Sequence, residues 1–164
     1  MCYFDESRFG TRSKLGHGWF RTGVRSQVEV KLGFENFYVY SAVDGSNGNH
    51  FSLIMPNVNT DWMNLFLQEL SDYYADQKVF LVMDRAAWHT TKKLVIPENI
   101  LIVHLPSYSP ELNPVERLWR YAKSKLLRNK LYNTLSELED VVSTFLRNLT
   151  RNTICGICAH DIIS

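Results

Sequence analysis

The chain has 164 residues, 45% of them hydrophobic and 13% aromatic, which is enough for one globular domain with a sizeable core. No apolar run approaches the roughly 20 residues that cross a bilayer, and the first residues lack the pattern of a signal peptide. The net charge of +1 is unremarkable, and three cysteines do not make a disulfide framework, so we expect a reducing, cytoplasmic setting.

The first half of the chain predicts three strands and a helix. An apolar start over 1–4 predicts a short strand that ends at Asp5, and the Gly-, Arg- and Ser-rich segment 7–31 predicts a loop or an irregular hairpin. Alternating aromatic and β-branched residues predict strands over 37–43 and 51–55, joined by a Gly- and Asn-rich turn. Thr60 is the predicted N-cap of the helix that follows.

The second half predicts two strands and two helices. Continuous apolar runs over 79–83 and 100–105 predict strands buried on both faces, with a short polar or helical piece between them. Asn113 followed by Pro114 predicts an N-cap and the first residue of a helix. The apolar stripe of this helix consists of Val115, Leu118, Trp119, Ala122 and Leu126.

A capping box at Thr134-Leu-Ser-Glu137 predicts the start of the last helix. Its apolar positions are Leu138, Val141, Val142, Phe145, Leu146 and Leu149. The order of elements predicts an α/β domain over residues 1–150, with a mixed sheet flanked by helices, and a C-terminal tail over 151–164.

Three carboxylates stand out against this pattern. Asp5 and Asp84 each follow an apolar run, and Glu116 lies on the first turn of a basic helix. Carboxylates from three separate segments suit two hard cations such as Mg²⁺, which catalyse in-line displacement at phosphorus without a protein nucleophile.

Each carboxylate also has a plainer interpretation. Asp84 could simply initiate the turn after its strand. Glu116 occupies the acidic position of a capping box, so it could bond back to Asn113. Asp5 is followed by Glu6, and because successive strand residues face opposite sides, only one of the two reaches a shared site.

Three motifs resemble the catalytic domain of DDE transposases, in the bacterial insertion-sequence branch of the mariner superfamily. They are Phe4-Asp5-Glu6-Ser7, Met83-Asp84-Arg-Ala-Ala-Trp-His89 and Pro106-Ser-Tyr-Ser-Pro-Glu-Leu-Asn-Pro-Val-Glu-Arg-Leu-Trp119. The resemblance covers residues 1–150, with 78 residues between Asp5 and Asp84 and 31 between Asp84 and Glu116.

The resemblance implies a ribonuclease-H-like fold with a mixed five-stranded sheet, and a catalytic, metal-binding triad of Asp5, Asp84 and Glu116. It selects Asp5 over Glu6, and leaves Glu6 solvated or paired with an arginine. Such enzymes use two Mg²⁺ ions, for which Mn²⁺ substitutes. They nick transposon ends and join the freed 3′ hydroxyl to target DNA, commonly at a TA dinucleotide. One departure is Arg85, where the family often has Asn.

The same resemblance implies double-stranded DNA as the partner, in the nucleoid of a bacterial cytoplasm. The helix-turn-helix modules that precede the catalytic domain in the family have no counterpart in this chain. We therefore expect either a homodimer or a partner chain that carries them. Two alternatives stay open: an inactive or regulatory transposase fragment, and a different metal nuclease of the same fold that cleaves RNA/DNA hybrids.

The charge pattern offers candidate DNA contacts. Segments 8–31 and 117–130 each carry six Lys or Arg residues, while acids gather around the first predicted helix. This predicts a basic face near the motifs, although two solvated surfaces would give the same pattern. The candidate contacts are Arg117, Arg120, Lys123 and His89. A solvated stripe or, for His89, a structural role are the alternatives.

Two other features favour structure over function. Trp119 belongs to the apolar stripe, so core packing is a better interpretation than base stacking. Cys155, Cys158 and His160 have zinc-like spacing, but a single Cys-x-x-Cys pair is weak evidence, and an apolar tail that carries cysteines is favoured.

Overall fold

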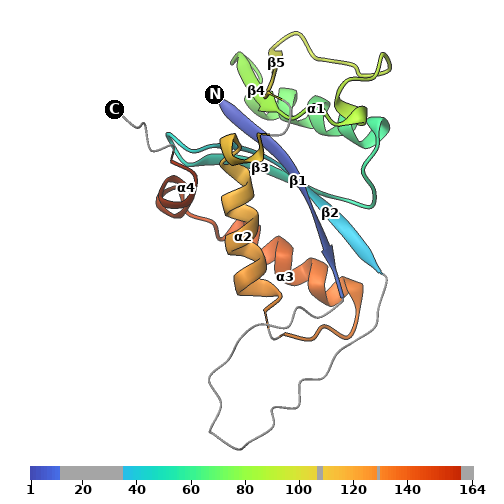
Figure 1. The fold of residues 1–164 in the computed structure, drawn as a ribbon, viewed down its shortest axis with the longest axis vertical. Coiled ribbons are helices and arrows are strands. Elements are labelled where there is room, and N and C mark those ends of the chain that lie inside the picture. The colour runs from blue at the N-terminus through green and yellow to red at the C-terminus, as the bar shows by residue number, and fades with distance from the viewer. Residues whose placement is uncertain (12–34, 107–108, 129, 160–164) are drawn as a thin grey trace, which may run out of the picture.

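The computed structural model describes residues 1–11, 35–106, 109–128 and 130–159 (Figure 1). Its elements are β1 (Cys2–Gly10), β2 (Asn36–Asp44), β3 (Asn49–Met55), α1 (Thr60–Tyr74), β4 (Val79–Met83), the short 3-10 helix η1 (Ala87–His89), β5 (Ile100–His104), a second 3-10 helix η2 (Pro110–Leu112), α2 (Val115–Leu126), α3 (Leu135–Arg147) and α4 (Arg151–Cys158). The basic residues predicted between Arg12 and Lys31, the motif residues Ser107 and Tyr108, and His160 lie outside the described residues.

The strands form one five-stranded sheet in the order β3-β2-β1-β4-β5. β1 and β2 are antiparallel, as are β2 and β3, whereas β4 runs parallel to both β1 and β5. This confirms the predicted mixed sheet. β1 lies at its centre, so both of its faces are available to position side chains.

Helices cover the two faces of the sheet unequally (Figure 1). On one face α1 packs against β1, β2 and β4 through a cluster that includes Phe4, Tyr40 and Phe66. On the other face α2, α3 and α4 pack over β1 and β2 through a second cluster that includes Phe9, Trp119 and Ile154. The predicted stripe of α2 is buried at all five positions.

β1 is longer than the sequence predicts. The strand was expected to end at Asp5, but it continues to Gly10, and all of its residues from Tyr3 onward pair with β2. Ser7, Arg8 and Gly10 are weak strand formers, so the cross-strand pairing with β2, and not local propensity, keeps them extended. As a result Asp5 lies inside a strand and not at its end.

The prediction that β4 and β5 are buried on both faces is wrong for part of each strand. Phe80 in β4 is 48% exposed, and Leu101 and Val103 in β5 are 56% and 43% exposed. β5 is an edge strand, and within the described residues the cluster formed by α2 to α4 includes residues of β1, β2 and β3 but none of β4 or β5. Apolar runs do not by themselves distinguish this arrangement from full burial.

The helix starts follow the predicted capping chemistry with small shifts. The N-cap of α1 is Asn59, one residue before the predicted Thr60, and its Oδ1 accepts a hydrogen bond from Trp62 N at 2.9 Å. In α3, Thr134 Oγ1 accepts from Glu137 N at 3.1 Å, while the Glu137 carboxylate accepts from Asn133 N at 2.9 Å. The carboxylate thus reaches one residue further back than a standard capping box.

The segment predicted as a C-terminal tail forms α4 up to Cys158. Ile154 and Cys158 are fully buried in the α2 to α4 core. The α4 backbone lies against the hairpin turn at Gly48, where φ is +73° and a Cβ atom would approach Arg151 O within 2.4 Å. Only glycine fits this close approach. Within the described residues, no helix has the length and apolar character needed to span a membrane.

Candidate active site

Asp5 lies on the face of the central strand that α2 covers. Side chains alternate along a strand. Tyr3 and Phe9 of β1 pack with the α2 to α4 core, whereas Phe4 packs with α1. Asp5 therefore shares the α2 side with Tyr3 and Phe9, and Glu6 shares the α1 side with Phe4.

Asp84 directly follows β4, the parallel neighbour of β1. Tyr3 pairs with Val82, and Asp5 and Asp84 each lie two residues beyond this pair. The register therefore carries the two aspartates to corresponding positions on adjacent strands, at the end where parallel strands of α/β sheets place ligands.

The carboxylate of Asp84 is already hydrogen-bonded within the protein. Its Oδ1 accepts from Ala86 N at 3.0 Å and lies 2.8 Å from His89 Nδ1. The bond to Ala86 is the turn-initiating contact that the sequence offered as an alternative role. The side chain is nevertheless 62% exposed, so it is also open to solvent.

Glu116 is exposed on the first turn of α2, and Asn113 fixes that turn to β1. Asn113 is buried; its Nδ2 donates to Phe4 O at 2.8 Å and its Oδ1 accepts from Val115 N at 3.1 Å. The helix begins at Val115, one residue later than predicted, with Pro114 in the N-cap position. In the described part of the chain, the Glu116 carboxylate does not bond back to Asn113 as a capping partner.

The three carboxylates interact electrostatically at Asp5. Burial, followed by the negative charges of Glu6, Glu116 and Asp84, raises the pKa of Asp5 from 3.8 to about 8. Like charges that share a site favour the protonated form of the most buried member. Asp5 is thus the point at which the acidic residues of β1, β4 and α2 converge.

The carboxylates near Asp5 do not form a complete metal-binding cluster among the described residues. Among the described residues, no group of three His, Cys, Asp or Glu side chains lies close enough together to hold a metal ion. The shared ion site of Asp5, Asp84 and Glu116 therefore stays a prediction.

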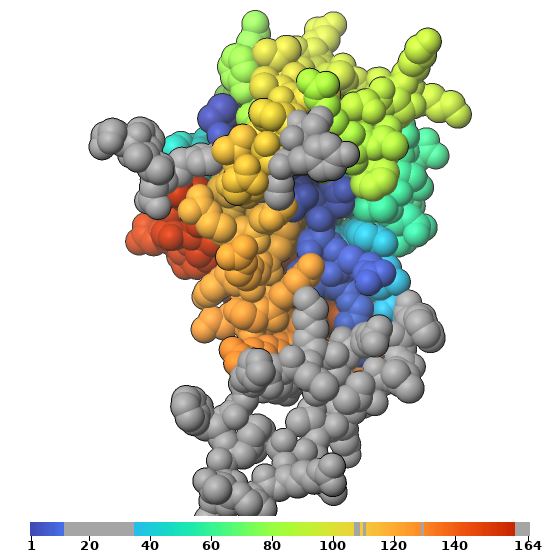
Figure 2. Space-filling model, in the orientation of Figure 1, coloured from blue at the N-terminus to red at the C-terminus, as the bar shows by residue number. Residues whose placement is uncertain are grey.

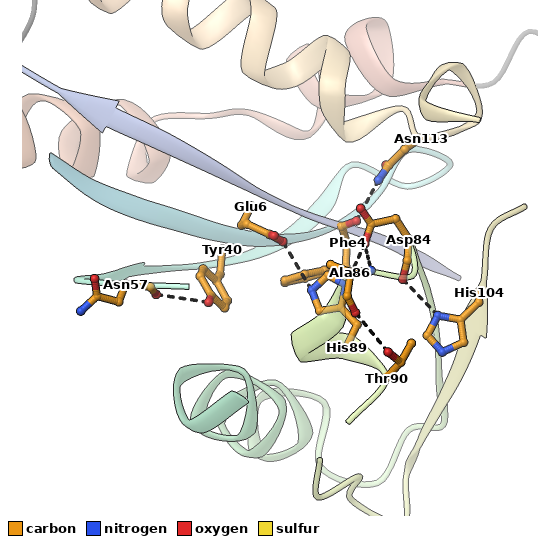
Figure 3. Close-up of polar contacts among 10 residues, drawn as sticks. All are labelled: Phe4, Glu6, Tyr40, Asn57, Asp84, Ala86, His89, Thr90, His104 and Asn113. Atoms are coloured by element: carbon orange, nitrogen blue, oxygen red, sulfur yellow. Dashed lines mark hydrogen bonds and ion pairs between the residues drawn. The ribbon is translucent and has the colours of Figure 1, made fainter. Parts of the chain in front are cut away.

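On the α1 side, Glu6 and His89 form a second polar cluster (Figure 3). His89 Nε2 lies 3.5 Å from Glu6 Oε2, and the ring is 2% exposed. Burial lowers the pKa of His89, but Glu6 and Asp84 outweigh burial and the net shift is upward. The prediction that Glu6 is solvated or paired with an arginine is therefore wrong: its nearest charged neighbour is this buried histidine.

The pattern of the DDE superfamily endonucleases matches residues 1–139 of this chain. The chain belongs to this family. Two curated relatives agree with it. An uncharacterized protein, y4pE/y4sA, from Sinorhizobium fredii is 35% identical over 107 residues, covering 65% of this chain and 77% of the relative. An uncharacterized 39 kDa protein of the insertion element IS630 from Shigella sonnei is 23% identical over 156 residues, covering 92% of this chain and 45% of the relative.

Solved structures confirm the ribonuclease-H-like fold. The Mos1 transposase paired-end complex with the left transposon end matches with a TM-score of 0.71 and 14% identity, over 96% of this chain and 50% of that one. Mos1 paired-end complexes with Mn and with Mg match with TM-scores of 0.71 and 0.65. The chain spans about half the length of the IS630 and Mos1 proteins. The predicted assignment to the insertion-sequence and mariner branch of the DDE family is confirmed.

The basic residues of α2 differ in their surroundings in this DDE domain. Arg120 is exposed, whereas Lys123 is half-buried with Nζ 5.6 Å from the centre of the Phe9 ring. Arg117 Nη2 donates to Ala159 O at 3.0 Å, which ties α2 to the end of α4. Of the three, Arg120 is therefore the most open to a ligand, and Arg117 has a structural bond in place.

Trp119 and Cys158 are packed in the core, in agreement with the structural roles predicted from the sequence. Trp119 is 5% exposed and packs edge-on against Phe9. Cys158 is buried, and its Sγ donates to Pro114 O at 3.5 Å; Cys155 is half-buried on the same helix. Burial raises the pKa of Cys158 to about 11, so its thiol stays protonated at neutral pH.

Proposed function

We propose that this chain is the catalytic domain of a transposase, which cleaves DNA strands at transposon ends and transfers them to target DNA. Asp5, Asp84 and Glu116 would hold two Mg²⁺ ions, with Mn²⁺ as a substitute. The observation that carries the proposal is the convergence of these carboxylates, from three separate segments, on the partly buried Asp5.

The donor set fits a hard divalent cation. All three side chains offer carboxylate oxygens, which Mg²⁺ prefers over nitrogen or sulfur. Burial and the charges of Glu6, Glu116 and Asp84 raise the pKa of Asp5, and a cation bound there would offset the repulsion between the carboxylates. Support also comes from the Mos1 paired-end complexes with Mn and with Mg, which have the same fold.

When bound by Asp5, Asp84 and Glu116, two divalent cations would supply an activated water or 3′ hydroxyl and would stabilise the leaving oxygen at phosphorus. The chain's own residues place the ligand oxygens. β1 supplies Asp5, the end of β4 supplies Asp84, and Asn113 holds the first turn of α2, with Glu116, against β1. Arg120 and Lys123, further along α2, would hold DNA phosphates beside the carboxylates.

Recognition of a particular DNA end would need more than this domain. We propose that a homodimer, or a partner bearing a helix-turn-helix region, selects the ends. Double-stranded DNA is the proposed substrate on the α2 side. Figure 2 shows α2 and β1 next to each other on this face.

Nicking of supercoiled plasmid in Mn²⁺ tests the proposal. Asp5→Asn, Asp84→Asn and Glu116→Gln should each lower the nicking rate by at least about 100-fold, because each removes a ligand for the cations. Asp76→Asn and Glu139→Gln, exposed acids on other parts of the surface, are matched controls and should retain full activity. Equal activity in the triad variants and the controls would overturn the proposal.

The same assay separates the two alternatives. A chain that binds Mn²⁺ through the triad but does not nick DNA, alone or mixed with a full-length relative, would be an inactive or regulatory fragment. Cleavage of an RNA/DNA hybrid but not of duplex DNA would identify a different nuclease of this fold.

A further inference from the structure

His89 is buried between two carboxylates that come from different strands. Its Nδ1 lies 2.8 Å from Asp84 Oδ1, and its Nε2 lies 3.5 Å from Glu6 Oε2. Figure 3 shows the ring between the two acids, with Glu6 on β1 and Asp84 at the end of β4. The histidine therefore connects the α1 side of β1 to a residue of the proposed metal site.

Packing fixes the plane of this ring. Phe4 and Trp88 contact it edge-on, with ring centroids 5.4 and 5.7 Å away. The ring is 2% exposed, and both nitrogens face carboxylates. It therefore presents no polar edge to DNA, which does not favour the predicted DNA contact for His89.

Among the described residues, the atoms of Glu6 and His89 that face each other have no other partner. Among the described side chains, Glu6 Oε2 and His89 Nε2 are both buried without a hydrogen bond that meets strict geometry. A separation of 3.5 Å is long for a hydrogen bond. Because a buried carboxylate oxygen without any compensating donor is costly, each of the two atoms orients the other.

We propose that Glu6 and His89 are positioning residues for Asp84: Glu6 orients the His89 ring, and Nδ1–H of that ring fixes Oδ1 of Asp84. Oδ2 of Asp84 then stays available for a cation. The inference rests on the proposed function, since it treats Asp84 as a metal ligand. Hydrogen bonds from outside the coordination sphere commonly orient ligands in this way, and their loss typically weakens metal binding about 10- to 100-fold.

The test measures Mn²⁺ affinity of the full chain without DNA, by isothermal titration calorimetry with electron paramagnetic resonance of free Mn²⁺. Asp84→Asn should raise the Kd most. Glu6→Gln and His89→Gln should each raise it about 10-fold. The control for His89 is His50→Gln, which changes a half-buried histidine of β3 that is bonded to Leu146 O; Glu98→Gln is the control for Glu6. Neither control should change the Kd.

A double variant distinguishes positioning from simple attraction of the cation by Glu6. If Glu6 acts through His89, Glu6→Gln combined with His89→Gln should bind Mn²⁺ as weakly as His89→Gln alone. Additive losses would mean that Glu6 acts directly on the cation, and would overturn the relay. Unchanged affinity in both single variants, with the loss confined to Asp84→Asn, would overturn the inference and leave the proposed function standing.

An NMR measurement of the His89 ring tests the same inference in the absence of metal. In the ¹⁵N–¹H correlation spectrum of the apo protein, His89 should carry a proton on Nδ1, which faces Asp84, and a second proton should lie between Nε2 and Glu6 Oε2. Glu6→Gln should shift the signals of both ring nitrogens. A proton found on Nε2 alone would overturn the relay even if His89→Gln fails to fold. If Asp84→Asn leaves Mn²⁺ binding intact, Asp84 is not a ligand, and both the inference and its part of the proposed function fall.

Discussion

Asp5 and Glu6 are adjacent in sequence, but the two faces of the sheet give them opposite surroundings. Asp5 shares the α2 side with Glu116, and burial, followed by the negative charges of Glu6, Glu116 and Asp84, raises its pKa. Glu6 shares the α1 side with His89, whose ring lies 3.5 Å away. On the α2 side a largely buried carboxyl group is exposed to the charges of other carboxylates, whereas on the α1 side a carboxylate lies beside a base.

The difference shows how one strand can serve a metal site twice. A strand with period two presents consecutive residues to opposite layers. In β1 the residue facing α2 is the proposed ligand, and the residue facing α1 supports a second ligand, Asp84, through His89. Both roles depend on the central position of β1 in the sheet.

The largest change in stability should come from replacing Phe4 or Phe9, the aromatic residues of β1 that lie on its two opposite faces. Phe4 and Phe9 are each 1% exposed, and Phe4→Ala and Phe9→Ala should each lower the free energy of unfolding by about 3–5 kcal/mol in urea titrations. Of these two residues Phe4 is the one whose ring packs against His89, so Phe4→Ala and not Phe9→Ala should move the His89 ring signals in NMR spectra. Equal shifts in both variants would show that the two faces are not independent.

Asn113 joins the faces, because it binds the carbonyl of Phe4 and starts the helix that bears Glu116. Asn113→Ala leaves Phe4 O and Val115 N without their partner, so unfolding should become easier by about 2–3 kcal/mol. Mn²⁺ affinity should fall as well, since Glu116 is no longer held against β1. Asn64→Ala also removes two hydrogen bonds, to Lys93 and Val95, but these do not join α2 to β1; it should leave Mn²⁺ binding unchanged.

The charge contrast itself predicts a pH-dependent stability. The folded pKa of Asp5, about 8, lies above its unfolded value of 3.8, so the folded state binds this proton more tightly. The resulting stability is complete below about pH 4 and is lost as pH rises to about 8. Asp5→Asn cannot ionise, and should be more stable than the parent by about 1–2 kcal/mol at pH 8.5 in EDTA, but not at pH 4.

Urea unfolding at the two pH values, with and without Mn²⁺, checks this prediction. Mn²⁺ should stabilise the parent chain at pH 8.5 and have little effect on Asp5→Asn. The exposed acid Asp76 provides the comparison, because Asp76→Asn should show no gain at either pH. A parent chain whose stability is flat from pH 4 to 8.5 would contradict the raised pKa.

Much of this arrangement is predictable from sequence, because the signals are local. The five apolar positions of α2 recur at helical spacing and all are buried. The run before Asp84 forms β4, and the Asn113-Pro114 pair precedes a helix. The three carboxylates are identified by the family motifs, because neither helical nor strand periodicity singles them out.

The features that were not predicted from the sequence depend on contacts between segments that are far apart in the chain. The alternation rule separates Asp5 from Glu6, but it does not reveal that His89, on η1, meets Glu6. The extension of β1 to Gly10 comes from pairing with β2, and the bond from Asn113 to Phe4 joins residues 109 positions apart. The exposure of Leu101 follows from the place of β5 at the sheet edge.

The smallest expected effect concerns DNA on the α2 side. Arg120 is exposed, so Arg120→Glu should weaken duplex binding by about 1 kcal/mol and lower the slope of log K against log salt by about one unit, as the loss of one phosphate contact requires. Lys78→Glu makes the same charge reversal at the opposite end of β4 from Asp84, and should change neither quantity. Fluorescence anisotropy over a salt series measures both. If the two variants weaken binding equally, the effect is one of net charge, and the α2 side has no privileged role in holding DNA.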